Sequence, residues 1–353
     1  MNDSIDQPTS LKSDKVSFDN LQKYLKDALD ISGTVEVKQF PSGFSNLTYL
    51  IKTEEKEYVL RRPPVGANIK SAHDMSREYK VLSLLKPVYD KIPDPIAYCD
   101  DENIIGASFY LMERVKGIIL RQKPPKGVVL NAELMKELST KTVDLLAELH
   151  SIPLEGELKN FGKPEGYVRR QVEGWIKRYY KAETDKLERI DEIVKWLENN
   201  MPGDLPGTFI HNDFKYDNLV LNPDDLTNVL AVLDWEMATV GNPLMDLGTT
   251  LGYWTEINDP DAMKYNLTWL PGNLNRQEFA ERYSERADQS IENILFYYVF
   301  GLFKIGVIVQ QIYKRYTLGH TKDERFAALP YVLKGCTDMA TRAINKNKIS
   351  NLY

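Results

Sequence analysis

The sequence predicts an α+β fold with two lobes: an N-terminal lobe built on an antiparallel five-stranded sheet plus a helix, and a C-terminal lobe that is mostly helical. The length of 353 residues exceeds the usual size of one hydrophobic core. Val35–Phe40 alternates apolar and polar side chains over most of its length, as a half-buried strand does, and further short apolar runs follow up to residue 115. From Ala132 onward, apolar side chains recur every three or four residues, which is the spacing of helices. We place a disordered tail at residues 1–16, the N-terminal lobe at 17–116 and the C-terminal lobe at 117–353.

The elements of the N-terminal lobe follow one another with short connections. Ser17 is a candidate cap for a helix over residues 17–30. The strands that we predict are Val35–Phe40, Leu47–Ile51, Tyr58–Arg62 and, as the fifth of the sheet, Phe109–Val115. A second helix covers Asp74–Lys86, and Pro87 ends it, because proline disfavours helical backbone in the residue before it.

Three polar residues within Ile210–Glu236 carry the clearest chemical signal. Asp213 stands five residues before Asn218, and Asp234 follows a short apolar run. This order and spacing are close to H-R-D-x-x-x-x-N followed by the metal-binding aspartate of phosphoryl-transfer enzymes. The alternative interpretation is a polar turn between two strands, with His211 and Asp217 as surface or hydrogen-bonded loop residues.

The chemistry of phosphoryl transfer requires these residue types. The protein mainly positions the reactants and neutralises charge. Asp213 is the candidate base that accepts the proton of an attacking hydroxyl. Asn218 and Asp234 are the candidate ligands of Mg²⁺, which prefers oxygen ligands and takes one or two carboxylates from the protein. We expect residues 218–221 and 229–233 to pair as a hairpin that brings Asp234 back beside Asn218.

The turn between the first two strands is the candidate cover for nucleotide phosphates. Gly43, Phe44, Ser45 and Asn46 lie there, at the position of the glycine-rich loop of kinases. The turn has one glycine where protein kinases have three, so an ordinary β-hairpin is also consistent with it. Its place in the chain favours nucleotide binding.

The third strand supplies the candidate cation for these phosphates. Arg61 occupies the position that holds lysine in V-A-I-K, and a guanidinium pairs with phosphate oxygens bidentately. Glu78 lies at the edge of the apolar stripe of the second helix. Since a carboxylate near a buried face needs a cationic partner, we predict an ion pair between Arg61 and Glu78. A Glu78 that contacts only water is the alternative. Arg62 points to the opposite face and is predicted to be solvated.

The end of the fifth strand is the candidate contact for adenine. Met112, Glu113 and Val115 stand where M-E-x-V occurs in the hinge of protein kinases. Backbone groups bind adenine in such hinges, so the side chains themselves carry little information. A plain strand end fits the same residues.

Taken together, these motifs resemble the aminoglycoside phosphotransferase-like small-molecule kinases, a branch of the protein-kinase-like superfamily. The similarity covers residues 30–340 and is closest to the kinase-like N-terminal domains of acyl-CoA dehydrogenase family members 10 and 11 and their free-standing bacterial relatives. The segments that carry it are Tyr58–Pro64, Phe109–Gly117, His211–Leu219 and Leu233–Gly248. The resemblance implies a bilobal protein-kinase-like fold, ATP and Mg²⁺ as cofactors, and a small-molecule hydroxyl as acceptor, with a hydroxyacyl-CoA as one candidate.

Departures from protein kinases narrow the substrate class. Asp234 is followed by Trp-Glu, and only eleven residues separate it from Asp246, too few for a peptide-binding activation loop. A protein substrate is therefore not expected. Asp246 begins an apolar helix and is predicted to hold backbone amides of the catalytic loop. Two roles stay open for Glu236, as a metal ligand or as a surface carboxylate.

Composition excludes several other classes. A formal net charge of -6 gives no sign of the basic patch that nucleic-acid-binding proteins carry. Cys99 and Cys336 lie far apart without C-x-x-C pairing, so we expect neither a disulfide framework nor a zinc site, and we predict a cytoplasmic protein. The most apolar segment, Ile294–Val309, is interrupted by Lys304 and is predicted to be a buried helix, not a membrane span.

Several charged residues of the C-terminal lobe have two candidate roles each. Lys304 either extends its ammonium to water at the edge of the core or faces the substrate. Four basic residues either form a solvated helix face or meet an anionic group such as a CoA phosphate: Arg169, Arg170, Lys177 and Arg178. His150 ends a helix, where a cation suits the helix dipole, and is predicted to be structural.

Three functions compete at this point. An ATP- and Mg²⁺-dependent small-molecule kinase leads. A kinase for cationic alcohols such as choline or aminoglycosides is the second, and its carboxylates would be Glu278, Glu281, Glu285, Asp288 and Glu292. A nucleotide-binding pseudokinase that acts through partners is the third, although the joint presence of Asp213, Asn218 and Asp234 argues against it.

Overall fold

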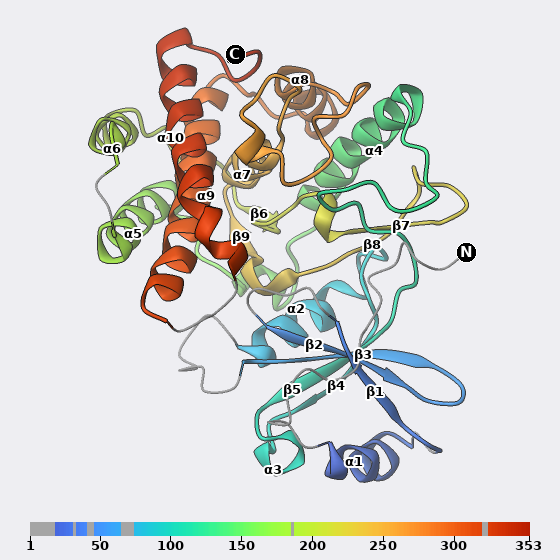
Figure 1. Ribbon diagram of the computed structural model, residues 1–353. Coiled ribbons are helices and arrows are strands. Elements are labelled where there is room, and N and C mark those ends of the chain that lie inside the picture. Colours follow the sequence, from blue (N-terminus) through green and yellow to red (C-terminus); the bar gives the residue numbers. More distant parts are fainter. Residues whose placement is uncertain (1–17, 31–32, 41–45, 65–73, 185–186, 320–323) are drawn as a thin grey trace. The chain divides into compact units, whose positions relative to one another are not determined.

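The computed structural model describes residues 18–30, 33–40, 46–64, 74–184, 187–319 and 324–353. The chain divides into two units (Figure 1). The first contains Met1–Ile119, Pro125–Gly127 and Asn218–Glu236, and the second contains Leu120–Pro124, Val128–Asp217 and Met237–Tyr353. The predicted tail at residues 1–16 lies outside the described residues.

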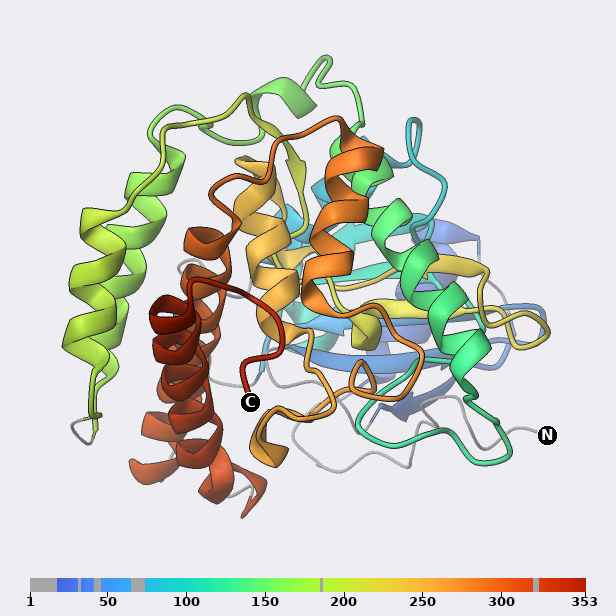
Figure 2. The same ribbon diagram turned by 90° about the horizontal axis from the view of Figure 1, so that it is seen from above.

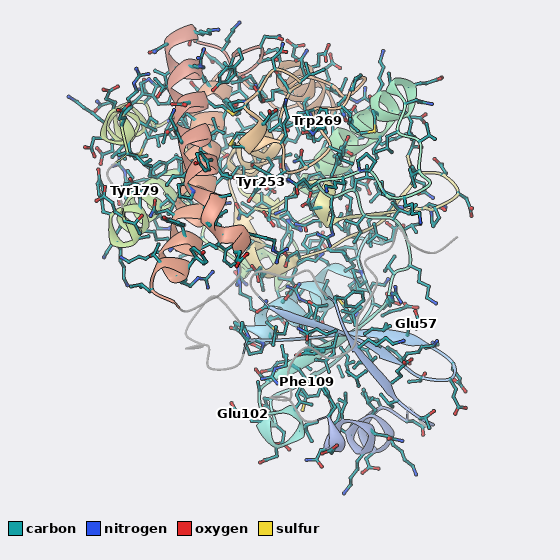
Figure 3. The ribbon with its side chains drawn as sticks, viewed as in Figure 1. Glu57, Glu102, Phe109, Tyr179, Tyr253 and Trp269 are labelled. Carbon is teal, nitrogen blue, oxygen red and sulfur yellow. The ribbon has the colours of Figure 1, made fainter. Side chains whose placement is uncertain are left out.

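A five-stranded antiparallel sheet in the order β1-β2-β3-β5-β4 forms the centre of the first unit. Its strands are β1 (Glu36–Gln39), β2 (Leu47–Lys52), β3 (Glu57–Arg62), β4 (Pro95–Cys99) and β5 (Phe109–Glu113). Phe109, labelled in Figure 3, is fully buried in the core beside the sheet. The α+β class and the antiparallel sheet are therefore confirmed.

Three helices accompany this sheet: α1 (Asp19–Leu29), α2 (Met75–Leu85) and α3 (Glu102–Ile105). The carboxylate of Asp74 caps α2 by accepting the N–H of Arg77 at 3.1 Å. Helix α2 packs on β4 and β5. Helix α1 buries Leu21 and Leu25 completely against the sheet core, which stabilises the unit by about 1.5–3 kcal/mol per leucine.

A hairpin from much later in the chain completes the first unit. Strands β7 (Leu219–Leu221) and β8 (Val229–Val232) pair antiparallel, as predicted. Leu221 also pairs with Ile118 through two backbone hydrogen bonds of 2.8 Å each. The adjoining Gly117 must be glycine, because a Cβ there would overlap the carbonyl oxygen of Leu221. We predicted this hairpin within the C-terminal lobe. Its contacts place it in the first unit, together with the sheet.

Seven α-helices and one small antiparallel pair of strands make up the described part of the second unit. The strands are β6 (Thr208–Ile210) and β9 (Thr239–Gly241). The helices are α4 (Ala132–His150), α5 (Tyr167–Ala182), α6 (Ile190–Asn199), α7 (Pro243–Tyr253), α8 (Arg276–Ala287), α9 (Ile294–Thr317) and α10 (Leu329–Lys346). Figure 2 shows α4 (green) beside α8 (orange), which Arg282 and Asp144 join by an ion pair of 2.7 Å.

Helix α9 packs against α5, α6, α7 and α10 and forms the centre of this unit. Gly248 on α7 and Gly301 on α9 let the two helices approach closely, since a Cβ on Gly301 would overlap the backbone of Gly248. By length and composition α9 could cross a membrane, but 78% of its most apolar 18-residue window is buried in the fold. It is longer than the predicted Ile294–Val309 and is buried, as we expected.

Candidate active site

The predicted ion pair between Arg61 and Glu78 is present in the first unit. Arg61 lies on β3, which pairs with β2 and β5 and is therefore an inner strand. Its guanidinium contacts the Glu78 carboxylate through Nη1 and Asp234 Oδ1 through Nη2 at 3.0 Å. The side chain of Glu78 is 2% exposed and that of Asp234 is 33% exposed. One cation thus connects the helix glutamate to the candidate metal ligand.

Burial shapes the electrostatics of this cluster. Desolvation raises the pKa of Glu78 to about 7, against the opposing charge of Arg61. Desolvation pushes the pKa of Arg61 downward, but the charges of Glu78, Tyr110, Asp234 and Glu236 together outweigh it, so the guanidinium stays charged. Among the described residues Arg61 Nε has no hydrogen-bond partner. The guanidinium therefore keeps a donor suited to a phosphate oxygen.

The hairpin holds the two candidate metal ligands next to each other. The N–H of Leu233 donates to the carbonyl of Asn218 at 2.8 Å, so Asp234 follows directly on the residue paired with Asn218. Asp234 has a left-handed backbone with φ of 67°. Both side chains offer oxygen atoms, which is the ligand chemistry that Mg²⁺ requires. The residues present therefore fit the cofactor that the sequence predicts.

Glu236, for which two roles were open, contacts the end of the β1–β2 turn. Asn46 Nδ2 donates to Glu236 Oε2 at 3.0 Å, and Asn46 is 3% exposed. The other predicted residues of this turn, Gly43, Phe44 and Ser45, lie outside the described residues.

Arg62 corrects a sequence-based prediction. It is 3% exposed and not solvated. Its guanidinium donates to the carbonyl of Ile105 at 2.6 Å and to that of Pro63 at 3.2 Å. Helix α3 ends at Ile105 and supplies this carbonyl acceptor, which the pattern of β3 alone does not reveal.

The predicted hinge residues stand at the end of β5. Met112 is buried, Glu113 is exposed and Val115 is half-buried. Adenine binding by their backbone stays a prediction.

In the second unit, the carboxylate of Asp213 is held by a lysine two residues further along the chain. Lys215 Nζ donates to both carboxylate oxygens, at 2.9 and 2.8 Å. The same ammonium lies 4.5 Å from the ring centre of Tyr253, which Figure 3 labels at the end of α7. We did not predict this role for Lys215; its signal in the sequence is its place two residues after Asp213.

Asp217, which the alternative interpretation made a surface or hydrogen-bonded loop residue, is half-buried. Burial raises the pKa of its carboxyl group to about 6, against the opposing charges of Lys215 and Arg121. Its Oδ1 has no hydrogen-bond partner within the described residues. A second carboxylate therefore lies near Asp213, whose charge contributes to this rise in the pKa of Asp217.

Asp246 holds the catalytic loop as predicted. Its carboxylate accepts the backbone N–H of His211 at 2.7 Å and that of Asn212 at 2.8 Å. His150, the last residue of α4, lies 3.1 Å from Asp246 through Nε2 and 2.6 Å from the hydroxyl of Tyr283 through Nδ1. His150 is thus structural, as predicted, and the residues before Asp213 are fixed by a buried polar network.

Of the two roles predicted for Lys304, the one that extends its ammonium to water is wrong. The residue is 2% exposed, and its ammonium donates to the carbonyl oxygen of Asn212 at 2.8 Å. The role that faces the substrate stays a prediction.

The basic residues of α5 are exposed, as a solvated face would be. Arg170 donates to the carbonyls of Lys163 and Glu165, and Arg169 pairs with Glu173 at 3.5 Å. Arg178 stacks over the ring of Trp175 at 4.5 Å. The carboxylates of the second functional hypothesis are exposed along α8 and the segment after it: Glu278, Glu281, Glu285, Asp288 and Glu292. Glu278 serves in the capping box of α8.

Comparison with known proteins decides the family. The model of the phosphotransferase enzyme family matches residues 36–281. This chain belongs to the phosphotransferase enzyme family. Among curated relatives of this phosphotransferase, mouse acyl-CoA dehydrogenase family member 10 is 33% identical over 87% of the chain, and human family member 11 is 34% identical over 89%. The chain spans 29% and 41% of the lengths of these two relatives.

Solved structures support the same family. A Ralstonia eutropha JMP134 protein that carries the name of an aminoglycoside phosphotransferase superposes with a TM-score of 0.76 at 27% identity, covering 93% of this chain and 99% of its own. Choline kinase from Cryptosporidium parvum shares the fold, with a TM-score of 0.58 at 15% identity over 89% of this chain and 91% of its own. The phosphotransferase fold is thus that of small-molecule kinases.

Proposed function

We propose that this phosphotransferase transfers the γ-phosphoryl group of ATP to a hydroxyl group of a small molecule and requires Mg²⁺. The observation that carries the proposal is the cluster of Arg61, Glu78 and Asp234, with Asn218 beside it on the same hairpin. A buried guanidinium that contacts a partly exposed carboxylate, with an Nε–H that has no partner in the described part of the chain, suits a metal–phosphate group.

The proposed mechanism assigns one role to each residue. The hydroxyl oxygen of the acceptor attacks the γ-phosphorus, the bond to the β–γ bridging oxygen breaks, and ADP leaves. Asp213 accepts the hydroxyl proton, and the ammonium of Lys215 fixes the orientation of its carboxylate. Arg61 binds phosphate oxygens. Mg²⁺, when bound through Asn218 and Asp234, neutralises charge on the phosphates.

The acceptor that we propose is a hydroxyacyl-CoA. The similarity to two relatives named as acyl-CoA dehydrogenase family members supports an acyl-CoA acceptor. Exposed Lys177 and Arg178 on α5 offer positive charge for the phosphates of CoA. For a cationic alcohol, the carboxylates of α8 offer weaker support, because Glu278 caps its own helix and Glu281 accepts from Gln277 at 2.8 Å.

A substrate panel tests the proposal. ATP consumption is measured with hydroxyacyl-CoAs, choline-like alcohols and aminoglycosides, with and without Mg²⁺. We expect Mg²⁺-dependent turnover on a hydroxyacyl-CoA. Turnover only on a cationic alcohol would contradict the acceptor, and a thermal shift with Mg-ATP but no turnover on any alcohol would contradict the activity.

Asp213→Asn tests the role of the base. We expect loss of turnover by about 10²-fold or more, because proton transfer of this kind contributes about 10²–10⁴-fold. Mg-ATP binding, measured by thermal shift, is expected to change little. The matched control is Asp224→Asn, the same change at an exposed position in the β7–β8 connection. Equal turnover in Asp213→Asn and the control would remove Asp213 from the mechanism.

A further inference from the structure

A buried lysine lies in the middle of α9, the long apolar helix at the centre of the second unit. Lys304 on α9 is 2% exposed, with apolar neighbours before and after it in the sequence. Lysine is almost never fully buried unless its ammonium is paired, because removing that charge from water is costly. The position therefore calls for an explanation in terms of what the ammonium contacts.

The main contact of Lys304 is with the backbone directly before the proposed base. Its Nζ donates to the carbonyl oxygen of Asn212 at 2.8 Å, and it lies 3.4 Å from Thr249 Oγ1 on α7. Asn212 has a left-handed backbone with φ of 67°, which is unfavourable for a residue other than glycine. The contacts of Asn212 thus help to hold the turn before Asp213 in this conformation.

The other polar atoms of Asn212 are also bonded. Its N–H donates to Asp246 Oδ1 at 2.8 Å. Its Nδ2 donates to the carbonyl of Met237 at 3.1 Å and to the hydroxyl of Tyr167 at 3.2 Å. Lys304 binds the remaining backbone group of Asn212, its carbonyl. Asn212 is therefore held by residues of α5, α7, α9 and the segment after β8.

The position of the Asn212 carbonyl determines how the backbone of Asp213 is oriented. The carbonyl of one residue and the N–H and Cα of the next lie in one planar peptide unit. A hydrogen bond to the Asn212 oxygen therefore also sets the orientation of the N–H and Cα of Asp213. That N–H donates in turn to His211 Nδ1 at 3.2 Å.

We propose that Lys304 is a positioning residue for Asp213, which it aims by fixing the peptide unit between Asn212 and Asp213. The inference rests on the proposed function of Asp213 as the base. Lys304 acts only through the peptide and is not expected to touch ATP or the acceptor.

The charges around Lys304 are consistent with this role. Burial lowers the pKa of its ammonium to about 8, while the negative charges of Asp246 and Asp213 oppose the decrease. Lys215 and Arg178 add to it. The Lys304 ammonium thus lies in the electric field of two carboxylates: Asp246, which holds the loop, and Asp213, which we propose that Lys304 positions.

Lys304→Met, which has a side chain of similar size without the ammonium, tests the proposal. We expect kcat to fall about 10- to 100-fold, since a displacement near 1 Å in an active site costs about 10²-fold. The KM for Mg-ATP is expected to stay within about twofold of the wild type, because a merely positioning residue leaves nucleotide binding intact. A kcat unchanged in a folded Lys304→Met protein would overturn the proposal.

A matched control is available on the same helix. Lys314 Nζ donates to the carbonyl of Lys181 at 2.7 Å, so Lys314→Met removes the same kind of bond ten residues away on α9. We expect it to leave kcat unchanged. If Lys304→Met does not fold, Lys304→Arg takes its place: the longer, planar group cannot donate along the same line, and we expect kcat to fall at least about threefold. Wild-type kcat in that variant would overturn the proposal equally.

Hydrogen exchange separates failure of this inference from failure of the proposed function. If the wild type transfers phosphate to no acceptor, the proposed function fails, but backbone amide exchange over residues 211–214 still reports on the loop. We expect faster exchange there in Lys304→Met than in the wild type, and no change in Lys314→Met. Equal exchange in both variants would overturn the positioning role whatever the activity.

Discussion

Asp246→Asn is a perturbation for which the structure predicts a large loss of stability. Asp246 is fully buried and accepts two backbone N–H groups, from His211 and Asn212, at 2.7 and 2.8 Å. An asparagine keeps one acceptor oxygen and replaces the other with an NH₂ group. One backbone donor then faces another donor and has no partner.

The magnitude follows from these contacts. A hydrogen bond to a charged group contributes about 1.5–3 kcal/mol, and an unsatisfied buried donor costs about 1–3 kcal/mol. The sum is about 2.5–6 kcal/mol, which brackets the cost of about 3–5 kcal/mol for breaking a buried charged pair. Because proteins typically have free energies of unfolding of about 5–15 kcal/mol, the change removes about a sixth of the stability or more.

The pH dependence has a definite sign. Burial pushes the pKa of Asp246 upward, but the hydrogen bond and charge of His150 and the amide of His211 outweigh it, so its pKa in the folded protein lies below the ordinary value of 3.8. A carboxylate of this kind contributes stability that is fully present above its unfolded pKa and is lost as the pH falls through its folded pKa. The difference between wild type and Asp246→Asn is therefore constant from pH 7 to 5 and shrinks below 3.8.

Urea unfolding of both proteins at several pH values measures this difference. The control is Asp204→Asn. Asp204 also accepts two backbone N–H groups, from Gly166 at 2.7 Å and Val168 at 3.5 Å, but it is exposed, so we expect a loss below about 1 kcal/mol. A loss in Asp246→Asn as small as in the control, or one that grows toward low pH, would refute the reasoning.

Two further predictions concern the cations. Arg61→Lys is expected to raise the KM for Mg-ATP about tenfold, because an ammonium acts as a point charge and lacks the planar fork with which a guanidinium binds phosphate bidentately; an unchanged KM in ATP titrations would count against a phosphate role for Arg61. Wild-type kcat is expected to fall above about pH 8, where the Lys304 ammonium, with its pKa lowered to about 8, loses its proton and becomes a weaker donor to Asn212. A profile that stays flat to pH 9.5 would contradict this. The charged groups that act on Lys304 come from α7, the catalytic loop and α5: Asp246, Asp213, Lys215 and Arg178.

The sequence was sufficient to predict features that depend on local spacing. The alternation of residues 35–62 placed the first three strands within one or two residues of β1, β2 and β3. The pair of Arg61 and Glu78 was predictable because a helix glutamate at a buried face needs a cation. The hairpin that places Asp234 beside Asn218 followed from two apolar runs joined by a polar turn.

Features that depend on distant packing could not be predicted in this way. Arg62 is buried because α3, forty residues later, supplies the carbonyl of Ile105. The role of Lys304 depends on Asn212, ninety-two residues earlier in the chain. A lysine inside an apolar helix signals only that something unusual surrounds it. The partner is a backbone carbonyl, which leaves no trace in the residue types.

Both loops proposed to carry chemistry contain a left-handed residue that is not glycine. Asn212 and Asp234 each have φ of 67°, at a cost of about 1–2 kcal/mol relative to ordinary backbone. Glycine would relieve that cost, and asparagine and aspartate are the side chains that tolerate the conformation best. At Asp234 a glycine would remove the carboxylate that contacts Arg61. At Asn212 it would remove the amide that donates to Tyr167 and Met237. Each of the two positions therefore requires its own side chain. The buried cations offset the strain: Arg61 binds the carboxylate of Asp234, and Lys304 binds the carbonyl of Asn212.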